Sequence, residues 1–128
     1  MTRVLLDTSV VIDPPAELPG VTLAFVSSVT LGELAAGVHT ARTATERARR
    51  LSRLQSLENT IETLPFGGAE ARAYGELSAL VIDVGRNPRP RRLDLQIAAT
   101  AAAHGLVLVT RNPDDFAGLD SLVHVIAP

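Results

Sequence analysis

The chain has 128 residues, a formal net charge of −2 and no cysteine. This length fits a single domain, residues 1–128, whose core is large enough to fold without a disulfide or a structural metal. The absence of cysteine excludes a disulfide scaffold and a zinc–thiolate site. A net charge near zero means that the chain lacks the overall positive charge that would by itself indicate nucleic-acid binding. The apolar run at the N-terminus is too short for a signal peptide or a membrane span, so we expect a cytoplasmic protein that does not enter the membrane.

Strands alternate with helices along most of the chain. The hydrophobic pattern predicts, in chain order, strands at 3–6 and 23–26, helices at 30–38 and 43–57, a strand at 60–64, helices at 69–84 and 93–104, and strands at 106–110 and 122–126. Gly105 is placed to end the helix before it. Several strands are continuously apolar, as in a sheet covered on both faces. The sequence therefore predicts a three-layer α/β domain with a mainly parallel sheet.

Acidic residues fall where the predicted strands pass into helices. Asp7 ends the first strand, Glu33 lies in the first turn after the second, Asp94 opens the alanine-rich helix, and Asp115 follows the strand at 106–110. Right-handed crossovers place all these junctions along one edge of the sheet, where ligands of open α/β sheets bind. We therefore expect the four carboxylates to form one cluster.

Each of these acids also has a purely structural interpretation. Glu33 fits a capping box with Thr30 as its N-cap. Asp94 fits a charge that complements the helix dipole, and Asp7 fits the cap of the turn that follows it. The run from Asn112 to Asp115 fits an N-cap, a proline and two acids favoured by the dipole.

A cluster of carboxylates creates an electrostatic conflict that capping alone does not resolve. Carboxylates within a few ångströms repel, and some must stay protonated unless a cation joins them. A hard divalent cation with oxygen ligands removes the conflict, and Mg²⁺ or Mn²⁺ is the natural choice where no thiolate is available.

Four segments of the sequence resemble the motifs of PIN domains of the VapC type. They are, in order, 4–12 (VLLDTSVVI), 27–34 (SSVTLGEL), 94–101 (DLQIAATA) and 109–116 (VTRNPDDF). The resemblance covers nearly the whole chain, with the order and spacing of the motifs preserved. It implies a PIN-like α/β/α fold and a Mg²⁺-dependent endoribonuclease that is the toxin of a type II toxin–antitoxin pair, with an RNA substrate and a VapB-like antitoxin as partners.

The resemblance also implies roles for individual residues. Asp7, Glu33, Asp94 and Asp115 match the acidic quartet of the family. Asp7 and Asp94 are the expected direct metal ligands; Glu33 and Asp115 could ligate the metal, act through water or activate the nucleophile, and one or two metal ions remain possible. The supporting positions are Ser9, beside the first acid, Asn112, near the fourth, and Asp114, which competes with Asp115 for the fourth place.

All 12 basic residues of the chain are arginine. Guanidinium groups hold phosphate bidentately, so the arginines near the acidic edge are candidates for binding the RNA backbone, and a solvated loop is the alternative. These candidates are Arg86, Arg89, Arg91, Arg92 and Arg111.

The helices after Glu33 and at 69–84 carry more apolar residues than one buried face requires. They predict a homodimer, as PIN toxins resembling this chain commonly form. The candidate contact residues are Ala35, Ala36, Val38, Leu77, Leu80 and Val81.

Two other functions fit parts of the pattern. A haloacid-dehalogenase-like phosphatase also places an Asp after its first strand, but that family has a second Asp where this chain has Ser9, and it needs a lysine. The non-enzymatic alternative is an α/β binding module whose acids only cap helices and which has no metal affinity. A dinucleotide-binding domain lacks support because no glycine-rich phosphate loop is present.

Overall fold

The computed structural model describes residues 2–128 and contains a five-stranded sheet in which every neighbouring pair is parallel. The strand order is β3-β2-β1-β4-β5. The strands are β1 (Thr2–Leu6), β2 (Val21–Ser27), β3 (Glu62–Leu64), β4 (Val107–Val109) and β5 (Val125–Ile126). The predicted α/β class and mainly parallel sheet are confirmed, and β1 lies at the centre of the sheet, between β2 and β4.

Five α-helices and two 3₁₀ turns connect the strands. They are α1 (Thr8–Ile12), α2 (Ser28–His39), α3 (Ala44–Thr60), α4 (Gly68–Asp83), η1 (Arg89–Arg91), α5 (Arg92–His104) and η2 (Pro113–Phe116). The sequence pattern missed α1, which at five residues is too short to show a helical period. Gly105 ends α5 in the left-handed conformation, with φ of 64°, as expected. The expected last strand, 122–126, is shortened to Val125–Ile126.

The sheet has a hydrophobic core on each face, which confirms the three-layer architecture. Leu5 points into the core formed with α4 and α5, whereas Val4 and Leu6, on the opposite face of β1, belong to the core formed with α1, α2 and α3. Alternate side chains of a strand face opposite sides of a sheet, so one continuously apolar strand serves both cores.

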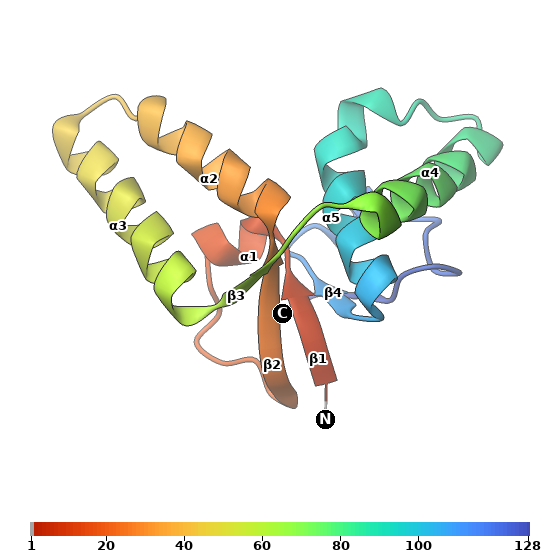
Figure 1. Ribbon diagram of the computed structural model, residues 1–128, viewed down its shortest axis with the longest axis horizontal. Coiled ribbons are helices and arrows are strands. Elements are labelled where there is room, and N and C mark those ends of the chain that lie inside the picture. Colours follow the sequence, from red (N-terminus) through yellow and green to blue (C-terminus); the bar gives the residue numbers. More distant parts are fainter. Residues whose placement is uncertain (1) are drawn as a thin grey trace.

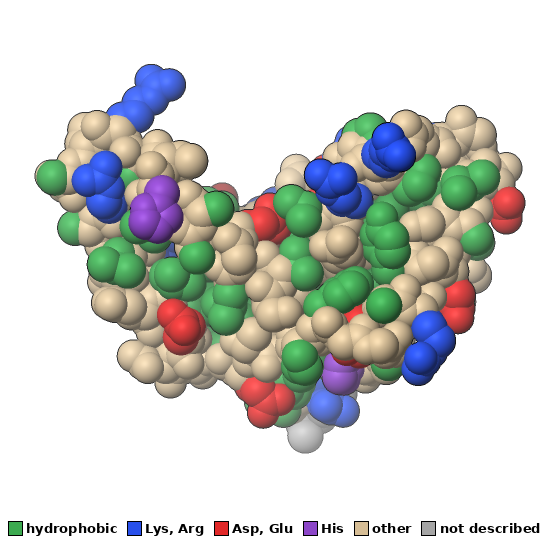
Figure 2. All heavy atoms as spheres, turned by 45° about the horizontal axis from the view of Figure 1, so that its top comes forward, with side chains coloured by type: hydrophobic (Ala, Val, Ile, Leu, Met, Phe, Trp, Pro, Cys, Tyr) green, Lys and Arg blue, Asp and Glu red, His purple; other side chains and the backbone are tan. Residues whose placement is uncertain are grey.

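The helices form two wings above the sheet (Figure 1). One wing is the hairpin of α2 and α3, and the other is α4 with α5, so that the upper ends of β1 and β2 lie between them. Figure 2 shows that the surface is hollowed between the wings, with acidic side chains in the hollow and basic side chains on the rim beside it. The carboxyl edge of the sheet thus opens into a groove.

Three leucine and valine residues differ from the expected exposure. Val38 and Leu77, expected at a dimer contact, are buried at 7% and 0% exposure. Leu77 packs in the core between α4 and the sheet. Leu51 shares one helical stripe of α3 with Leu54 and Leu57, a spacing that predicts burial, but it is 43% exposed. The pattern identified apolar helix faces but did not indicate which of them the sheet covers.

The burial of Leu77 predicts a large stability effect. Leu77→Ala should lower the free energy of unfolding by about 2–5 kcal/mol, because it removes apolar contacts and leaves a cavity. Leu51→Ala makes the same substitution on an exposed helix face and should alter the free energy of unfolding by less than about 0.5 kcal/mol. Urea denaturation of the two variants and the wild type gives the comparison. Similar losses for both variants would show that Leu77 is not part of the core.

Candidate active site

Asp7 lies at the centre of the carboxyl edge, directly after β1. Its side chain is 5% exposed and accepts two hydrogen bonds on the same oxygen, Oδ2, from Ser9 Oγ (2.7 Å) and Thr110 Oγ1 (2.8 Å). Asp7 occupies the N-cap position of α1, but its side chain makes no capping hydrogen bond. The interpretation of Asp7 as a simple cap is therefore wrong. Two hydroxyl groups fix the carboxylate and leave Oδ1 without a hydrogen bond from the described residues.

Ser9 and Thr110 connect β1 to the turn that follows β4. Ser9 Oγ accepts a hydrogen bond from the backbone N–H of Arg111 (3.0 Å), and Thr110 Oγ1 accepts one from that of Asn112 (3.1 Å). Ser9 therefore lies beside the first acid as predicted. Thr110 was missed, although a hydroxyl residue ending an apolar strand next to β1 is a signal that could have indicated it.

Glu33 reaches the same edge from α2. Its Oε1 accepts a hydrogen bond from Thr8 Oγ1 (2.8 Å), whose oxygen also lies 3.0 Å from Thr30 Oγ1. The capping-box interpretation of Glu33 is wrong: the N-cap of α2 is Ser27, and Thr30 is fully buried within the helix. Burial raises the pKa of Glu33, the Thr8 hydrogen bond lowers it, and the charges of Asp7 and Asp94 raise it further.

Asp94 and Asp115 approach the edge from the other wing. Burial raises the pKa of Asp94, and the neighbouring charges of Asp7 and Asp115 add to the effect, while Arg91 lowers it. The Arg91 guanidinium lies 3.0 Å from Asp115 Oδ1 and 3.7 Å from Asp94 Oδ2. Arg91, expected to bind RNA, thus pairs with two of the acids.

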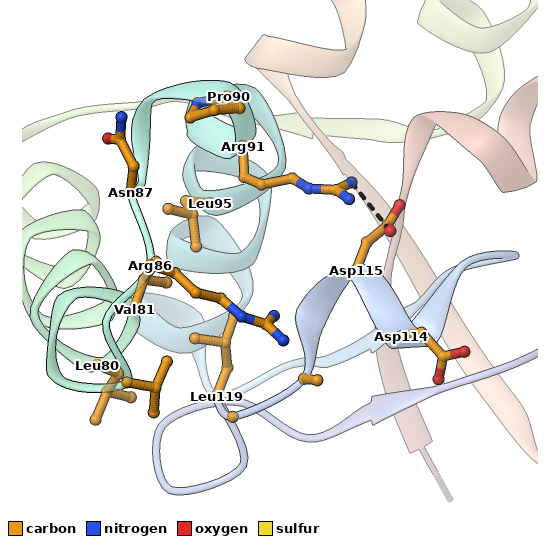
Figure 3. A pocket seen from close by; sticks show the side chains of 13 residues that line it. Leu80, Val81, Arg86, Asn87, Pro90, Arg91, Leu95, Asp114, Asp115 and Leu119 are labelled. Atoms are coloured by element: carbon orange, nitrogen blue, oxygen red, sulfur yellow. Dashed lines mark ion pairs between the residues drawn. The ribbon is translucent and has the colours of Figure 1, made fainter.

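The two adjacent acids of η2 point in different directions. Figure 3 shows Asp115 directed toward Arg91, whereas the carboxylate of Asp114 turns away from it. Asn112 precedes η2, but its side chain makes no capping hydrogen bond, contrary to the expected N-cap role. The geometry thus favours Asp115 over Asp114 as the fourth acid of the cluster.

The arginines near the edge fall into two groups. Arg86, Arg89 and Arg92 are exposed. The Arg111 guanidinium instead donates to the backbone carbonyl of Asp13, from Nε (3.0 Å) and Nη2 (2.7 Å), and so secures the end of α1. The side chain of Arg111 is therefore hydrogen-bonded within the protein, and its expected contact with RNA stays a prediction.

The donor atoms at this edge suit a hard divalent cation. The cluster offers only carboxylate oxygens, with hydroxyl groups behind them, and the raised pKa values of Glu33 and Asp94 express the repulsion that a cation would relieve. Within residues 2–128, no three acidic or histidine side chains converge closely enough to hold one cation as they stand. Arg91 neutralises Asp94 and Asp115 in this arrangement.

Comparison with known proteins identifies the family. The PIN domain profile matches residues 4–122, which is most of the chain. The chain belongs to the PIN-domain family. It is 43% identical over 97 residues to ribonuclease VapC5 of Mycobacterium tuberculosis, covering 76% of this chain and 69% of that protein. It is 32% identical over 103 residues to ribonuclease VapC1 of Rickettsia felis, covering 77% and 72% of the two chains.

A solved structure agrees over the full length. The crystal structure of VapBC-5 from M. tuberculosis, a member of the VapBC family of toxin–antitoxin systems, matches with a TM-score of 0.83 and 38% sequence identity, covering 99% of this chain and 98% of that chain. This PIN protein is therefore a VapC-family ribonuclease toxin of a type II toxin–antitoxin system. The alternatives of a phosphatase and a non-catalytic binding module are set aside.

The raised pKa of Asp94 predicts a specific dependence of stability on pH. The folded protein retains this proton to a higher pH than the unfolded chain, so deprotonation costs stability as the pH rises through the interval between the ordinary value of 3.8 and the raised pKa. Asp94→Asn removes the charge. In EDTA, the Tm of this variant should exceed that of the wild type at pH 7, and the difference should disappear below the ordinary pKa.

Asp120→Asn is the matched control, since it removes an exposed carboxylate outside the cluster. Its Tm should follow that of the wild type across the same pH range. A Tm of Asp94→Asn at or below the wild-type value at pH 7 would contradict the repulsion argument.

No helix within residues 2–128 has both the length and the apolar character that crossing a membrane would require.

Proposed function

We propose that this VapC ribonuclease cleaves RNA phosphodiester bonds internally with the help of Mg²⁺, for which Mn²⁺ could substitute, held by Asp7, Asp94 and Asp115 with Glu33 beside them. The observation that carries the proposal is the electrostatic coupling of these acids at one sheet edge: the charges of Asp7 and Asp115 both raise the pKa of Asp94. Carboxylates that the fold holds together despite their repulsion are expected at a cation site, and they are not expected if each acid only caps its own helix.

A bound Mg²⁺ would supply a water molecule of lowered pKa and neutralise charge that develops on the phosphate. The chain's own residues prepare the site for this chemistry. Ser9 and Thr110 fix the orientation of Asp7 through Oδ2. Glu33 is held by Thr8, and burial raises its pKa; a carboxylate at this position is suited to accept a proton from the attacking water.

Arg91 couples the acidic cluster to the substrate. Its guanidinium lies near one oxygen of Asp94 and one of Asp115, so it competes with a cation for the negative charge of these two carboxylates. Its position at the end of η1, beside the groove, then allows it to pair with a phosphate of the RNA, for which a guanidinium is well suited. Arg89, the first residue of η1, and Arg92, the first residue of α5, are also exposed and extend this basic rim.

Substitution of Asp94 tests the proposed metal site directly. Asp94→Asn should abolish RNA cleavage and lower the affinity for Mn²⁺ in calorimetry at least about tenfold, because a ligand and its charge are lost. Arg91→Ala should tighten Mn²⁺ binding, because it removes a competing cation.

Asp114→Asn is the matched control for the metal site. It removes the adjacent carboxylate that points away from the cluster, and should leave Mn²⁺ affinity within about twofold of the wild type. Wild-type cleavage and Mn²⁺ binding by purified, folded Asp94→Asn would refute the proposed site.

A cognate VapB-like antitoxin is the proposed protein partner. The matching solved structures include VapBC-5 from M. tuberculosis and FitAcB from Neisseria gonorrhoeae, the latter with a TM-score of 0.73 and 27% identity. The groove beside Glu33 is lined by Ile12 of α1, which is an apolar side chain with 52% exposure, and by the charged side chains of Glu46 and Arg50 of α3. An amphipathic helix of the antitoxin could place its apolar face there and cover the acids.

We also propose a homodimer. Ala35 and Ala36 remain exposed on α2, and Ile82 near the end of α4 is 58% exposed. Burial of such residues between two copies would remove apolar area from water.

Light scattering of variants tests the dimer. Ile82→Glu should shift the protein from dimer to monomer at micromolar concentration, because it places a charge in an apolar contact. Leu51→Glu makes a comparable change on the exposed face of α3 and should leave the dimer intact. A monomeric wild type under the same conditions would contradict the proposal.

A further inference from the structure

A pocket of about 510 Å³ opens beside the acidic cluster, between the end of α4, the loop at 84–91 and η2. Its floor is apolar (Figure 3), and is formed by Leu80, Val81, Leu95 and Leu119. Leu95 and Leu119 are each 2% exposed and belong to the core, so the floor is rigid. The volume lies within the roughly 300–1,000 Å³ typical of small-molecule sites.

The pocket adjoins the place proposed for cleavage. Asp115 and Arg91 line it and also form the ion pair of the acidic cluster. A group bound in the pocket would therefore be a neighbour of a phosphate held at the acids. Ile82, proposed for the dimer contact, is not part of the lining.

Arg86 supplies a cation directed into the pocket. Gly85, with φ of 79°, ends α4 by donating from its N–H to the carbonyl of Ile82 (2.8 Å), and the N–H of Arg86 donates to that of Val81 (3.1 Å). This turn brings Arg86 over the pocket, and Figure 3 shows its guanidinium extending into it. The guanidinium forms no ion pair with any acid of residues 2–128, in contrast to Arg91.

We propose that this pocket binds an unpaired guanine base of the RNA, adjacent to the bond that is cleaved; the inference rests on the proposed ribonuclease function of the acidic cluster. A nucleobase has apolar faces and polar edges. The faces match the leucine and valine floor, and an edge matches the guanidinium of Arg86, which forms no ion pair with an acid of residues 2–128. The donor fork of an arginine pairs with O6 and N7 of guanine, whereas adenine presents a donor in place of O6.

The charge around the pocket favours RNA over an apolar peptide segment. Arg89 in η1 and Arg92 at the start of α5 are exposed beside the pocket, so that an RNA strand entering the pocket passes cations suited to its phosphates. Aromatic residues make up 3% of the chain, and the lining contains none. Base recognition here must therefore use an apolar floor and a guanidinium rather than an aromatic stacking platform.

Binding of short RNAs to the cleavage-deficient Asp94→Asn protein provides the test, because it does not depend on catalysis. The probes are an all-uridine 12-mer, the same RNA with one central guanine, and the same RNA with 7-deazaguanine, which lacks N7. The guanine RNA should bind about fivefold or more tightly than either of the others. Adding Arg86→Ala to this protein should remove the difference. Adding Ala117→Phe, which places a ring at the exposed edge of the pocket, should also remove it.

Arg89→Ala in the same background is the matched control, since it removes an arginine of the same loop that does not line the pocket. It should weaken the binding of all three RNAs and preserve their ratio. Circular dichroism confirms that each variant is folded. Equal affinity for the three RNAs would overturn the proposal and leave the pocket to a side chain of a protein partner. A guanine preference that survives both Arg86→Ala and Ala117→Phe would overturn it as well.

Cleavage by the otherwise wild-type protein separates this proposal from the proposed function. With Mn²⁺, cuts in the guanine RNA should fall at one fixed position next to the guanine, and Arg86→Ala should scatter them. Failure to cleave any RNA, together with a guanine preference in binding, would refute the proposed function and keep the base pocket. Cleavage at positions unrelated to guanine would refute the pocket and keep the function.

Discussion

The mutual repulsion of carboxylates at one sheet edge is the constraint on which the rest of the site depends. A parallel sheet brings the carboxyl ends of its strands together, and Asp7, Glu33 and Asp115 lie just after β1, β2 and β4. Asp94 reaches the same edge from the first turn of α5, which follows α4 and η1 in the chain. Hydroxyl groups that donate hydrogen bonds to Asp7 and Glu33 stabilise these two carboxylates. The guanidinium of Arg91, which lies between Asp94 and Asp115, stabilises the other two. Each of these groups stabilises a charge without removing it, so the site keeps its capacity for a divalent cation.

The two halves of the site are stabilised by different means. Asp7 is held by short hydrogen bonds within a buried network that also connects β1 to the turn after β4. Asp94 and Asp115 are held by one partly exposed arginine, which a competing cation or an anionic substrate can displace. The position of Asp7 is therefore fixed, whereas the side chains of Arg91, Asp94 and Asp115 can rearrange relative to it.

The sequence predicted the sheet, the order of most elements and the four acids, because each of these features leaves a periodic or positional signal. Strands that are apolar throughout indicate burial on both faces, and polar residues at their ends indicate the functional edge. Thr8 and Thr110 left a weaker signal, since a threonine at a strand end has many structural uses. The pairing of Arg91 could not be predicted, because the direction of a long side chain depends on neighbours from other parts of the chain. The exposure of Leu51 and the burial of Leu77 likewise depend on which helix face the sheet covers.

The division of the helices into two wings affects how the acids can work together. Glu33 belongs to the wing of α2 and α3, and Asp94 belongs to the wing of α4 and α5. Asp115 lies in η2, which contacts α5, and Asp7 directly follows β1. The spacing of the carboxylates is thus a measure of how far apart the wings stand. Any molecule that spreads or draws together the two wings changes the distances across the cluster without contacting a single carboxylate. The width of the groove therefore determines whether the four carboxylates are close enough to bind one cation together.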